Sequence, residues 1–297
     1  MEEGVRKYFI LLCLVPVLVW AFFKYGDFFG DKKPPPKGVQ FSQDIDKPVR
    51  AYVRRNENDP VRYYYPIERK ELVGIKQMQL PRLLAVTVNG MEAFPDLEKL
   101  DLSDNSILDI KNLSTCPVLQ ELLLDKNKLV DITPLGNIST LKTLTLTQNK
   151  ITDISGLARL SNEHLKEIPP CLEILKLDDN AVSDLSPIAK LTTLKVLEIC
   201  NNQVTDITPL AKLVNLQILK LSGNQIRDIS AIQQMPKLIW LSLENNKITD
   251  ITPIARNTAL GKSTEIYLQG NPIDIPSQKE NFLAIKGRGS KVTFFKK

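Results

Sequence analysis

Aliphatic residues recur along the chain at a fixed interval. Residues 194 to 215 read LKVLEICNNQVTDITPLAKLVN, and residues 216 to 237 repeat the same skeleton with other residues at the variable positions. The leucine that opens each unit recurs every 22 residues, except for one interval of 31 residues, at Leu97, Leu119, Leu141, Leu172, Leu194, Leu216 and Leu238. An internal period of this length predicts a stack of similar structural units. The nine extra residues of the long interval fall within 161–171, which we expect to form a loop on the outside of one unit.

Each unit follows the pattern L-x-x-L-x-L-x-x-N-x-I-x-x-I, and its positions have separate physical roles. In Leu197-x-Ile199 the alternation predicts a short strand with both aliphatic side chains facing inward. The asparagine that follows can donate and accept, so it can satisfy backbone groups where the chain leaves the strand. An aspartate suits the next turn, and Thr208-Pro209 resembles a helix N-cap followed by proline at the first helical position. One unit cannot bury its own leucines, so stacked units must share a core.

The repeated phrase resembles the internalin-type, bacterial branch of the leucine-rich repeat proteins, and the 22-residue unit is shared with the eukaryotic SDS22-type phosphatase regulators. The resemblance covers about residues 85–275, in which asparagine recurs at Asn105, Asn127, Asn149, Asn180, Asn202, Asn224, Asn246 and Asn271. It implies an α/β fold: a right-handed solenoid with a parallel sheet on the concave side, short 3-10 or α-helical segments on the convex side, and a partner protein on the concave face. The chain has no LPxTG sorting signal and no immunoglobulin-like domain after the repeats, so the role of a Gram-positive surface adhesin does not carry over.

A solenoid needs a cap at each end, because its terminal units otherwise expose their core. We expect the N-terminal cap to contain LLAVTVNGMEAF (83–94) as a degenerate first strand. At the other end, Ser277 to Glu280 matches a capping box that opens a helix ending at Gly287, and KVTFF (291–295) predicts a last strand. The expected organisation is an N-terminal anchor or signal segment (1–26), a tether (27–66), an N-terminal cap (67–96), about eight repeat units (97–275) and a C-terminal cap (276–297).

The N-terminal segment contains one apolar run, Tyr8–Phe23, between two basic residues and Lys24. Sixteen helical residues cover roughly 24 Å, slightly less than the ~30 Å hydrocarbon layer of a bilayer. We expect a hydrophobic helix that serves as a single-pass membrane anchor. A signal peptide cleaved after Ala21, which would make the protein secreted, and a buried helix are the alternatives. Lysines flank the run on both sides, so the charge distribution does not decide which side of the membrane the repeats face.

The segment 27–66 contains DKKPPPKG and few aliphatic residues, which is typical of an extended tether that holds the repeats away from the membrane.

Information about a partner must lie in the variable strand positions, because the repeated skeleton forms the core. Neighbouring strands lie about 4.8 Å apart, so equivalent positions form rows across the sheet. One row reads Lys99, Glu121, Thr143, Ile174, Val196, Ile218, Trp240 and Glu265, and the next contains Lys176, Glu198, Lys220, Ser242 and Tyr267. We predict a contact ridge formed by Ile174, Val196, Ile218 and Trp240, with Tyr267 diagonal to Trp240 and with Lys176, Glu198 and Lys220 setting the register of the partner. The alternative is that β-branched residues simply suit strands and that neighbouring segments cover the row.

Composition argues against other classes of function. The net charge is +5, but residues 71–275 carry 20 Lys/Arg against 24 Asp/Glu, which is unfavourable for nucleic acid binding along the repeats. The chain has one histidine, His164, whereas metal sites and nucleophiles activated by histidine usually need further residues of this kind. Gly261-Lys-Ser-Thr264 resembles the end of a phosphate-binding loop but lacks its first glycine. Cys116, Cys171 and Cys200 have no spacing that indicates a disulfide framework or zinc.

These observations predict a membrane-tethered, non-catalytic scaffold that binds a protein on its concave face and needs no cofactor, metal or small-molecule substrate. A secreted or surface adhesin of the internalin type, a structural spacer in the envelope, and an SDS22-like regulatory subunit of an enzyme are the alternatives.

Overall fold

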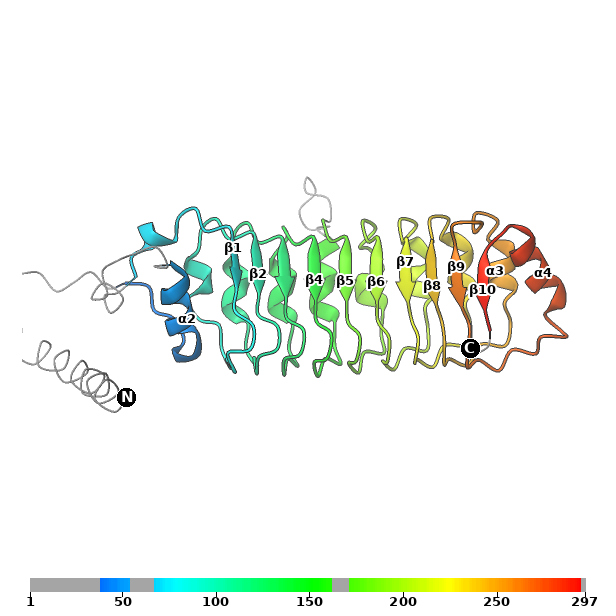
Figure 1. Ribbon diagram of the computed structural model, residues 1–297, viewed down its shortest axis with the longest axis horizontal. Coiled ribbons are helices and arrows are strands. Elements are labelled where there is room, and N and C mark those ends of the chain that lie inside the picture. The colour runs from blue at the N-terminus through cyan, green and yellow to red at the C-terminus, as the bar shows by residue number, and fades with distance from the viewer. Residues whose placement is uncertain (1–37, 54–66, 162–170, 295–297) are drawn as a thin grey trace, which may run out of the picture. The chain divides into compact units, whose positions relative to one another are not determined.

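Ten short strands form one parallel sheet in the computed structural model of the chain, which describes residues 38–53, 67–161 and 171–294. Each strand pairs with the next along the chain, as Figure 1 shows. The strands are β1 (Gln77–Gln79), β2 (Lys99–Asp101), β3 (Glu121–Leu123), β4 (Thr143–Thr145), β5 (Ile174–Lys176), β6 (Val196–Glu198), β7 (Ile218–Lys220), β8 (Trp240–Ser242), β9 (Glu265–Tyr267) and β10 (Lys291–Thr293). All of them belong to the unit Val39–Lys297. The predicted solenoid of parallel strands is therefore confirmed.

Short helical segments return the chain from one strand to the next, and most of them are 3-10 helices (η). They are η3 (Arg69–Leu72), η4 (Met91–Ala93), η5 (Lys111–Thr115), η6 (Thr133–Asn137), η7 (Ser155–Ser161), η8 (Ser186–Ile188), η9 (Thr208–Lys212), η10 (Ser230–Gln234) and the α-helix α3 (Thr252–Arg256). Their starts differ in one detail from the prediction. Thr208 does not cap η9; instead its backbone N–H donates to the carboxylate of Asp206 over 2.8 Å. A carboxylate two residues earlier is the stronger acceptor for this exposed amide.

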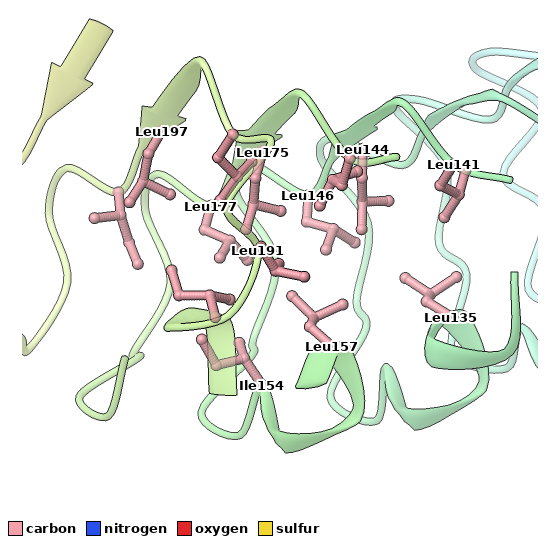
Figure 2. Packing of buried hydrophobic residues seen from close by; sticks show 14 of the residues in the cluster. Leu135, Leu141, Leu144, Leu146, Ile154, Leu157, Leu175, Leu177, Leu191 and Leu197 are labelled. Atoms are coloured by element: carbon pink, nitrogen blue, oxygen red, sulfur yellow. The ribbon is translucent and has the colours of Figure 1, made fainter. Parts of the chain in front are cut away.

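The core lies between the sheet and these helical segments, as Figure 2 shows for Leu144, Leu175 and Leu157 among others. The consensus aliphatic residues are almost completely buried; Leu194, Leu197 and Ile199 of one unit are 0% exposed. Full burial of one such side chain is worth about 1.5–3 kcal/mol. Because every unit contributes the same set of positions, the core is continuous along the stack.

The repeated asparagines connect successive units. The side-chain amide of Asn202 donates to the carbonyls of Leu177 in the preceding unit and Cys200 in its own unit, each over 2.9 Å. Its oxygen accepts the backbone N–H of Val182, also in the preceding unit, over 2.9 Å. The residue before each asparagine has a positive φ, as at Asn201, or is a glycine, as at Gly223. The predicted scaffold role of the asparagines is confirmed.

The N-terminal end of the sheet differs from the prediction. The first strand is β1 at Gln77–Gln79, and residues 83–94, predicted to contain it, form the turn and return of that unit. Met78 and Leu80 take the inward positions, and Leu83 stands where later units have asparagine. The unit was not recognised in the sequence because its strand contains methionine and glutamines instead of leucine, and its turn lacks the asparagine.

Part of the predicted tether is folded. Residues 43–53 form the helix α2 (Gln43–Val53), and its Ile45 and Val49 are fully buried against the first unit. The helix is held there by the Asp44 carboxylate, which accepts the N–H of Val86 over 3.0 Å, and by the Tyr52 hydroxyl, which donates to the carbonyl of Gln77 over 2.6 Å. The tether prediction is wrong for these residues, because two aliphatic residues one helical turn apart are enough to cover the end of a core. Residues 54–66 lie outside the described residues.

The C-terminal end is closed by α4 (Lys279–Gly287) and β10, as predicted, but not by a capping box. No side chain caps α4, and Ser277 instead donates through its hydroxyl to the carbonyl of Asp274 over 2.9 Å. The sequence did not predict the contact that fastens the end of α4 to the last unit. The guanidinium of Arg288 donates there to the carbonyls of Ile254, Ala255 and Leu260.

None of the helices in the described ranges is long and apolar enough to cross a bilayer. The run Tyr8–Phe23 lies outside those ranges, as does most of the loop at 161–171.

The asparagine bonds lead to a prediction about stability. Replacing Asn202 with alanine leaves the buried N–H of Val182 without its acceptor and takes one of two donors from each of the Leu177 and Cys200 carbonyls, so we expect the free energy of unfolding to fall by about 1–3 kcal/mol. Urea unfolding followed by circular dichroism measures the change. The exposed neighbour Gln203 is the control, and its replacement with alanine should change stability by less than about 0.5 kcal/mol. Equal effects of the two substitutions would show that the asparagine bonds carry little stability.

Candidate functional site: the outer face of the sheet

The variable strand positions form continuous rows on one face of the sheet, here called the outer sheet face. Ile174 pairs with Val196, Val196 with Ile218, and Ile218 with Trp240 in the registers of β5 to β8. These four residues, here called the apolar ridge, are neither fully buried nor fully exposed. Thr143 precedes them in the row and Glu265 follows them. The predicted register is confirmed, and the binding role of the ridge stays a prediction.

Trp240 and Tyr267 form an aromatic pair at the C-terminal end of the ridge. Tyr267 is in register with Ser242 of β8, which places it diagonally from Trp240, and the two ring centroids lie 4.8 Å apart. The Tyr267 hydroxyl donates to the carboxylate of Glu265 over 2.8 Å, and Lys291 pairs with the same carboxylate at 2.8 Å. The hydrogen bond to Glu265 and burial raise the pKa of Tyr267, and the bond from Lys291 lowers the pKa of Glu265. The pair is thus held in place by a hydrogen-bonded chain that reaches the last strand.

The three charged residues beside the ridge bind one another. The Glu198 carboxylate lies 3.5 Å from the ammonium of Lys176 and 3.0 Å from that of Lys220. Its side chain is 12% exposed, whereas the lysine side chains are 38% and 35% exposed. The predicted alternation in sign is present. Its immediate effect is that all three charges are already paired within the sheet, with one net positive charge left on the trio.

None of the predicted site residues lies in the third row, which consists of the residues two positions after those of the second row, among them Asp125, Asp178, Cys200, Ser222 and Glu244. This row contains a partly buried carboxylate, that of Asp178. Asp178 accepts the backbone N–H of Cys200 over 2.6 Å. Asp125 repeats the arrangement two strands earlier, where it accepts the N–H of Thr147 over 2.7 Å. Burial, the largest cause, raises the pKa of Asp178 and also raises the pKa of the Cys200 thiol to about 12. Cys200 is therefore a protonated, weakly reactive thiol at neutral pH.

Two serines bind Glu244 of the third row near the aromatic pair. Glu244 accepts hydrogen bonds from the hydroxyls of Ser222, over 2.6 Å, and Ser242, over 2.5 Å. The equivalent positions in other units hold different polar residues, so the period locates this face but does not reveal which side chains bond to one another.

Comparison with known proteins gives the family. A model described as leucine-rich repeats (two copies) matches residues 170–212 and 214–256, while no curated protein matches the chain. Among solved structures, internalin C2 of Listeria monocytogenes is 33% identical, with a TM-score of 0.67 over 77% of this chain and 96% of that one. The chain is an internalin-like leucine-rich repeat protein. The predicted resemblance is confirmed.

Two further structures are similar to the internalin-like chain. Internalin F of Listeria monocytogenes is 29% identical, with a TM-score of 0.66 over 90% of this chain and 80% of that one. The ectodomain of the plant receptor kinase GASSHO1/SCHENGEN3 from Arabidopsis thaliana, solved in complex with Casparian strip integrity factor 2, is 23% identical, with a TM-score of 0.56 over 73% of this chain and 25% of that one. The likeness to the plant receptor extends to the fold alone.

The motif that resembles a phosphate-binding loop is a structural turn in the internalin-like chain. Gly261 donates its N–H to the Thr264 hydroxyl over 3.2 Å, and that hydroxyl donates to the carbonyl of Leu238 over 3.0 Å. Thr264 is 2% exposed, so its hydroxyl is not available to a nucleotide. His164 lies outside the described residues.

Within the described part of the chain, no group of three or more His, Cys, Asp or Glu residues is placed to hold a metal ion, and Cys116 and Cys200 are free thiols. An open cavity of about 440 Å³ lies beside β1 and is lined by Tyr52, Gly74, Lys76 and Glu98 among others. Lys76 and Glu98 pair with each other at 2.9 Å, and the bond raises the pKa of Lys76.

The partly buried carboxylate of Asp178 predicts a pH-dependent difference in stability. Replacing Asp178 with asparagine keeps an acceptor for the N–H of Cys200 and removes the charge. The folded pKa of Asp178 lies above its ordinary value of 3.8, so the wild-type protein loses stability as the pH rises through the folded pKa. We therefore expect D178N to be the more stable protein at neutral pH.

Below the ordinary pKa of 3.8 the aspartic acid is neutral in the folded and unfolded chains alike, so the advantage of D178N should vanish there. Urea unfolding of both proteins across this pH range measures the difference. A difference that does not change with pH would show that burial of the charge is not its cause.

Proposed function

We propose that the internalin-like chain is a non-catalytic scaffold that binds a protein partner across the outer sheet face, centred on the apolar ridge. The observation that carries this proposal is the uninterrupted line Ile174, Val196, Ile218 and Trp240, which lies on a face where the other variable positions are mainly polar. The line of partly exposed aliphatic residues ends at a Trp–Tyr pair, and these two aromatic residue types are enriched in interaction hot spots.

The charges around the ridge support a partner whose contact surface is largely uncharged. Glu198 is saturated by Lys176 and Lys220, and Lys99 pairs with Glu121 at 3.0 Å further along the sheet. Burying such ion pairs in an interface costs desolvation energy. A charged group of the partner would gain little from them, because they already bind one another. The central contact should therefore be apolar, with polar groups at its rim.

The same pairing supports the absence of catalysis. The acidic side chains of the outer sheet face are occupied by lysines, hydroxyl groups or backbone amides, as at Glu198, Glu244 and Asp178. A general acid or base must instead face the reacting group of a substrate. No specific observation favours an adhesin, a structural spacer or an enzyme regulator over a protein-binding scaffold.

We further propose that Tyr8–Phe23 anchors the protein in a membrane, with residues 24–38 joining it to the folded unit. The length and apolarity of the run support the anchor, and the DKKPPPKG sequence supports an extended connection.

The ridge is tested by site-specific photo-crosslinking in the cells that produce the protein. A photoreactive phenylalanine analogue at Ile218 should give a discrete crosslinked product, because this position lies at the centre of the proposed interface. The same analogue at Val130, which is 54% exposed in an early unit, should give none. Equal products from both positions, or none from Ile218, would contradict the proposed interface and would favour a structural spacer.

Substitutions then separate loss of binding from loss of fold. Changing Ile218 and Trp240 to serine should weaken capture of the crosslinked partner by about 30-fold or more, since the loss of even one hot-spot residue costs at least about 2 kcal/mol. The melting temperature should remain close to that of the wild type. Leu219 lies between the two rows and is 0% exposed, so Leu219→Ser serves as the control that unfolds the repeats. A similar loss of fold in the ridge variant would mean that Ile218 and Trp240 are core residues.

The membrane anchor is tested by fractionation combined with protease treatment of intact cells. We expect the full-length protein in the membrane pellet, released by detergent and not by high salt, because an inserted apolar segment is insensitive to screening. Degradation of the repeats in intact cells would place them outside, and protection would place them inside. A shortened, soluble product that begins near Phe22 would contradict the anchor and indicate a cleaved signal.

A further inference from the structure

Two buried polar atoms at the aromatic end of the outer sheet face have no hydrogen-bond partner. They are the indole nitrogen of Trp240 and the side-chain oxygen of Gln269; the third such atom in the described residues is the hydroxyl of Ser290 in the C-terminal cap. Buried polar groups in folded proteins are almost always paired, so an unpaired donor and an unpaired acceptor on one surface require an explanation.

The two atoms belong to one group of side chains on adjacent strands. Gln269 follows Tyr267 by two residues, and alternation sends both side chains to the outer sheet face. Backbone bonds from Leu243 to Tyr267 over 2.9 Å and from Asn245 to Gln269 over 2.8 Å align this stretch with the one that follows Trp240. The ring of Tyr267 lies against the indole with centroids 4.8 Å apart.

Other polar atoms of the cluster have partners or are not buried. One oxygen of Glu244 accepts from Ser222 and Ser242, and the hydroxyl of Tyr267 donates to Glu265. Among the buried atoms of the cluster, the open hydrogen-bonding capacity is therefore one donor, the indole N–H, and one acceptor, the oxygen of Gln269.

Neutral groups that both donate and accept match this pair, and in a protein partner the backbone supplies them at almost every residue. A carboxylate cannot donate to Gln269 and would also lie near Glu244, and an ammonium group cannot accept from the indole. The backbone of an extended peptide offers carbonyl acceptors and N–H donors in alternation, at a rise of about 3.3 Å per residue. Such a segment offers both kinds of group along its length, and its backbone carries no net charge.

We propose that Trp240 and Gln269 bind the backbone of an extended peptide segment of the partner, with a peptide carbonyl accepting the indole N–H and a peptide N–H donating to Gln269. This inference rests on the proposed function, because it requires the partner to be a protein. Both atoms are shielded in the free protein, so a neighbouring side chain must move when the peptide binds. Tyr267, whose ring lies on the indole, is placed to do so, and its bond to Glu265 holds it closed in the free protein.

The proposal is tested by NMR on the full chain in detergent with ¹⁵N-labelled tryptophan indoles. The chain has two tryptophans, Trp20 and Trp240, so the variant W240F assigns the two N–H signals. The probe is N-acetylglycine N-methylamide, which carries peptide donors and acceptors. The matched control probe is N-acetylsarcosine dimethylamide, which keeps the carbonyls and has no N–H. We expect a saturable shift of the Trp240 signal with the first probe, and a half-saturating concentration about fivefold higher with the second, because the hydrogen bond to Gln269 is lost.

Variants separate a binding role of Gln269 from a structural one. In Gln269→Met, which keeps the length of the side chain, the two probes should become equivalent. Gln203→Met, at an exposed glutamine elsewhere, should retain the fivefold difference. Tyr267→Ala should lower the half-saturating concentration of both probes, because the covering ring is gone, and circular dichroism confirms that each variant is folded.

Several outcomes would overturn the proposal: no saturable shift of the Trp240 signal, the same affinity for both probes in the wild type, or an undiminished difference in Gln269→Met. A saturable shift with methyl glucoside and none with the peptide probes would assign the cluster to carbohydrate instead. Each of these results leaves the crosslinking at Ile218 unaffected, so failure of the peptide subsite is distinguishable from failure of the proposed interface.

Discussion

The fold depends on one constraint: a unit of 22 residues cannot bury its own leucines and must share its core with neighbours. Burial alone does not fix how neighbours align, because aliphatic contacts have no direction. The asparagine side chains supply that direction. Each one bonds to carbonyls of its own unit and of the preceding unit, as Asn202 does with Cys200 and Leu177, and so sets the strands in register. The rows on the outer sheet face follow from this register.

The inward positions are all used for stability, so recognition is confined to what the rows display. Within those rows the polar residues largely satisfy one another. Glu198 binds two lysines, Glu244 binds two serines, and Asp178 binds a backbone amide. What remains is an aliphatic line and an aromatic pair with two unsatisfied atoms beside it. The surface therefore combines a frame of polar residues that are bonded to one another with a few residues that gain from a partner, which is the preorganisation that favours specific binding.

The period predicted the strands, the inward leucines, the asparagine bonds and the composition of each row, because these depend only on spacing. It failed where the chain stops repeating. Met78 replaces leucine in the first unit, and Ile45 and Val49 cover that unit from a segment with too few aliphatic residues to suggest a helix, which contains Pro48 as well. At the site, the spacing placed Lys176, Glu198 and Lys220 side by side but could not show that they pair with one another rather than with a partner. The hydrogen bond of Asp178 and the unpaired atoms of Trp240 and Gln269 depend on side-chain conformations, which no periodic pattern encodes.

The asparagine bonds also give the stack a polarity. Every asparagine completes the unit that precedes it in the chain, and the first unit, which has no predecessor, carries Leu83 at that position and is closed by α2. The N-terminal end is thus finished before any later unit exists, while each later unit arrives with the groups that its predecessor lacks. A chain that leaves the ribosome N-terminus first can therefore assemble in the order of its synthesis, with each new unit docking on a surface that is already formed.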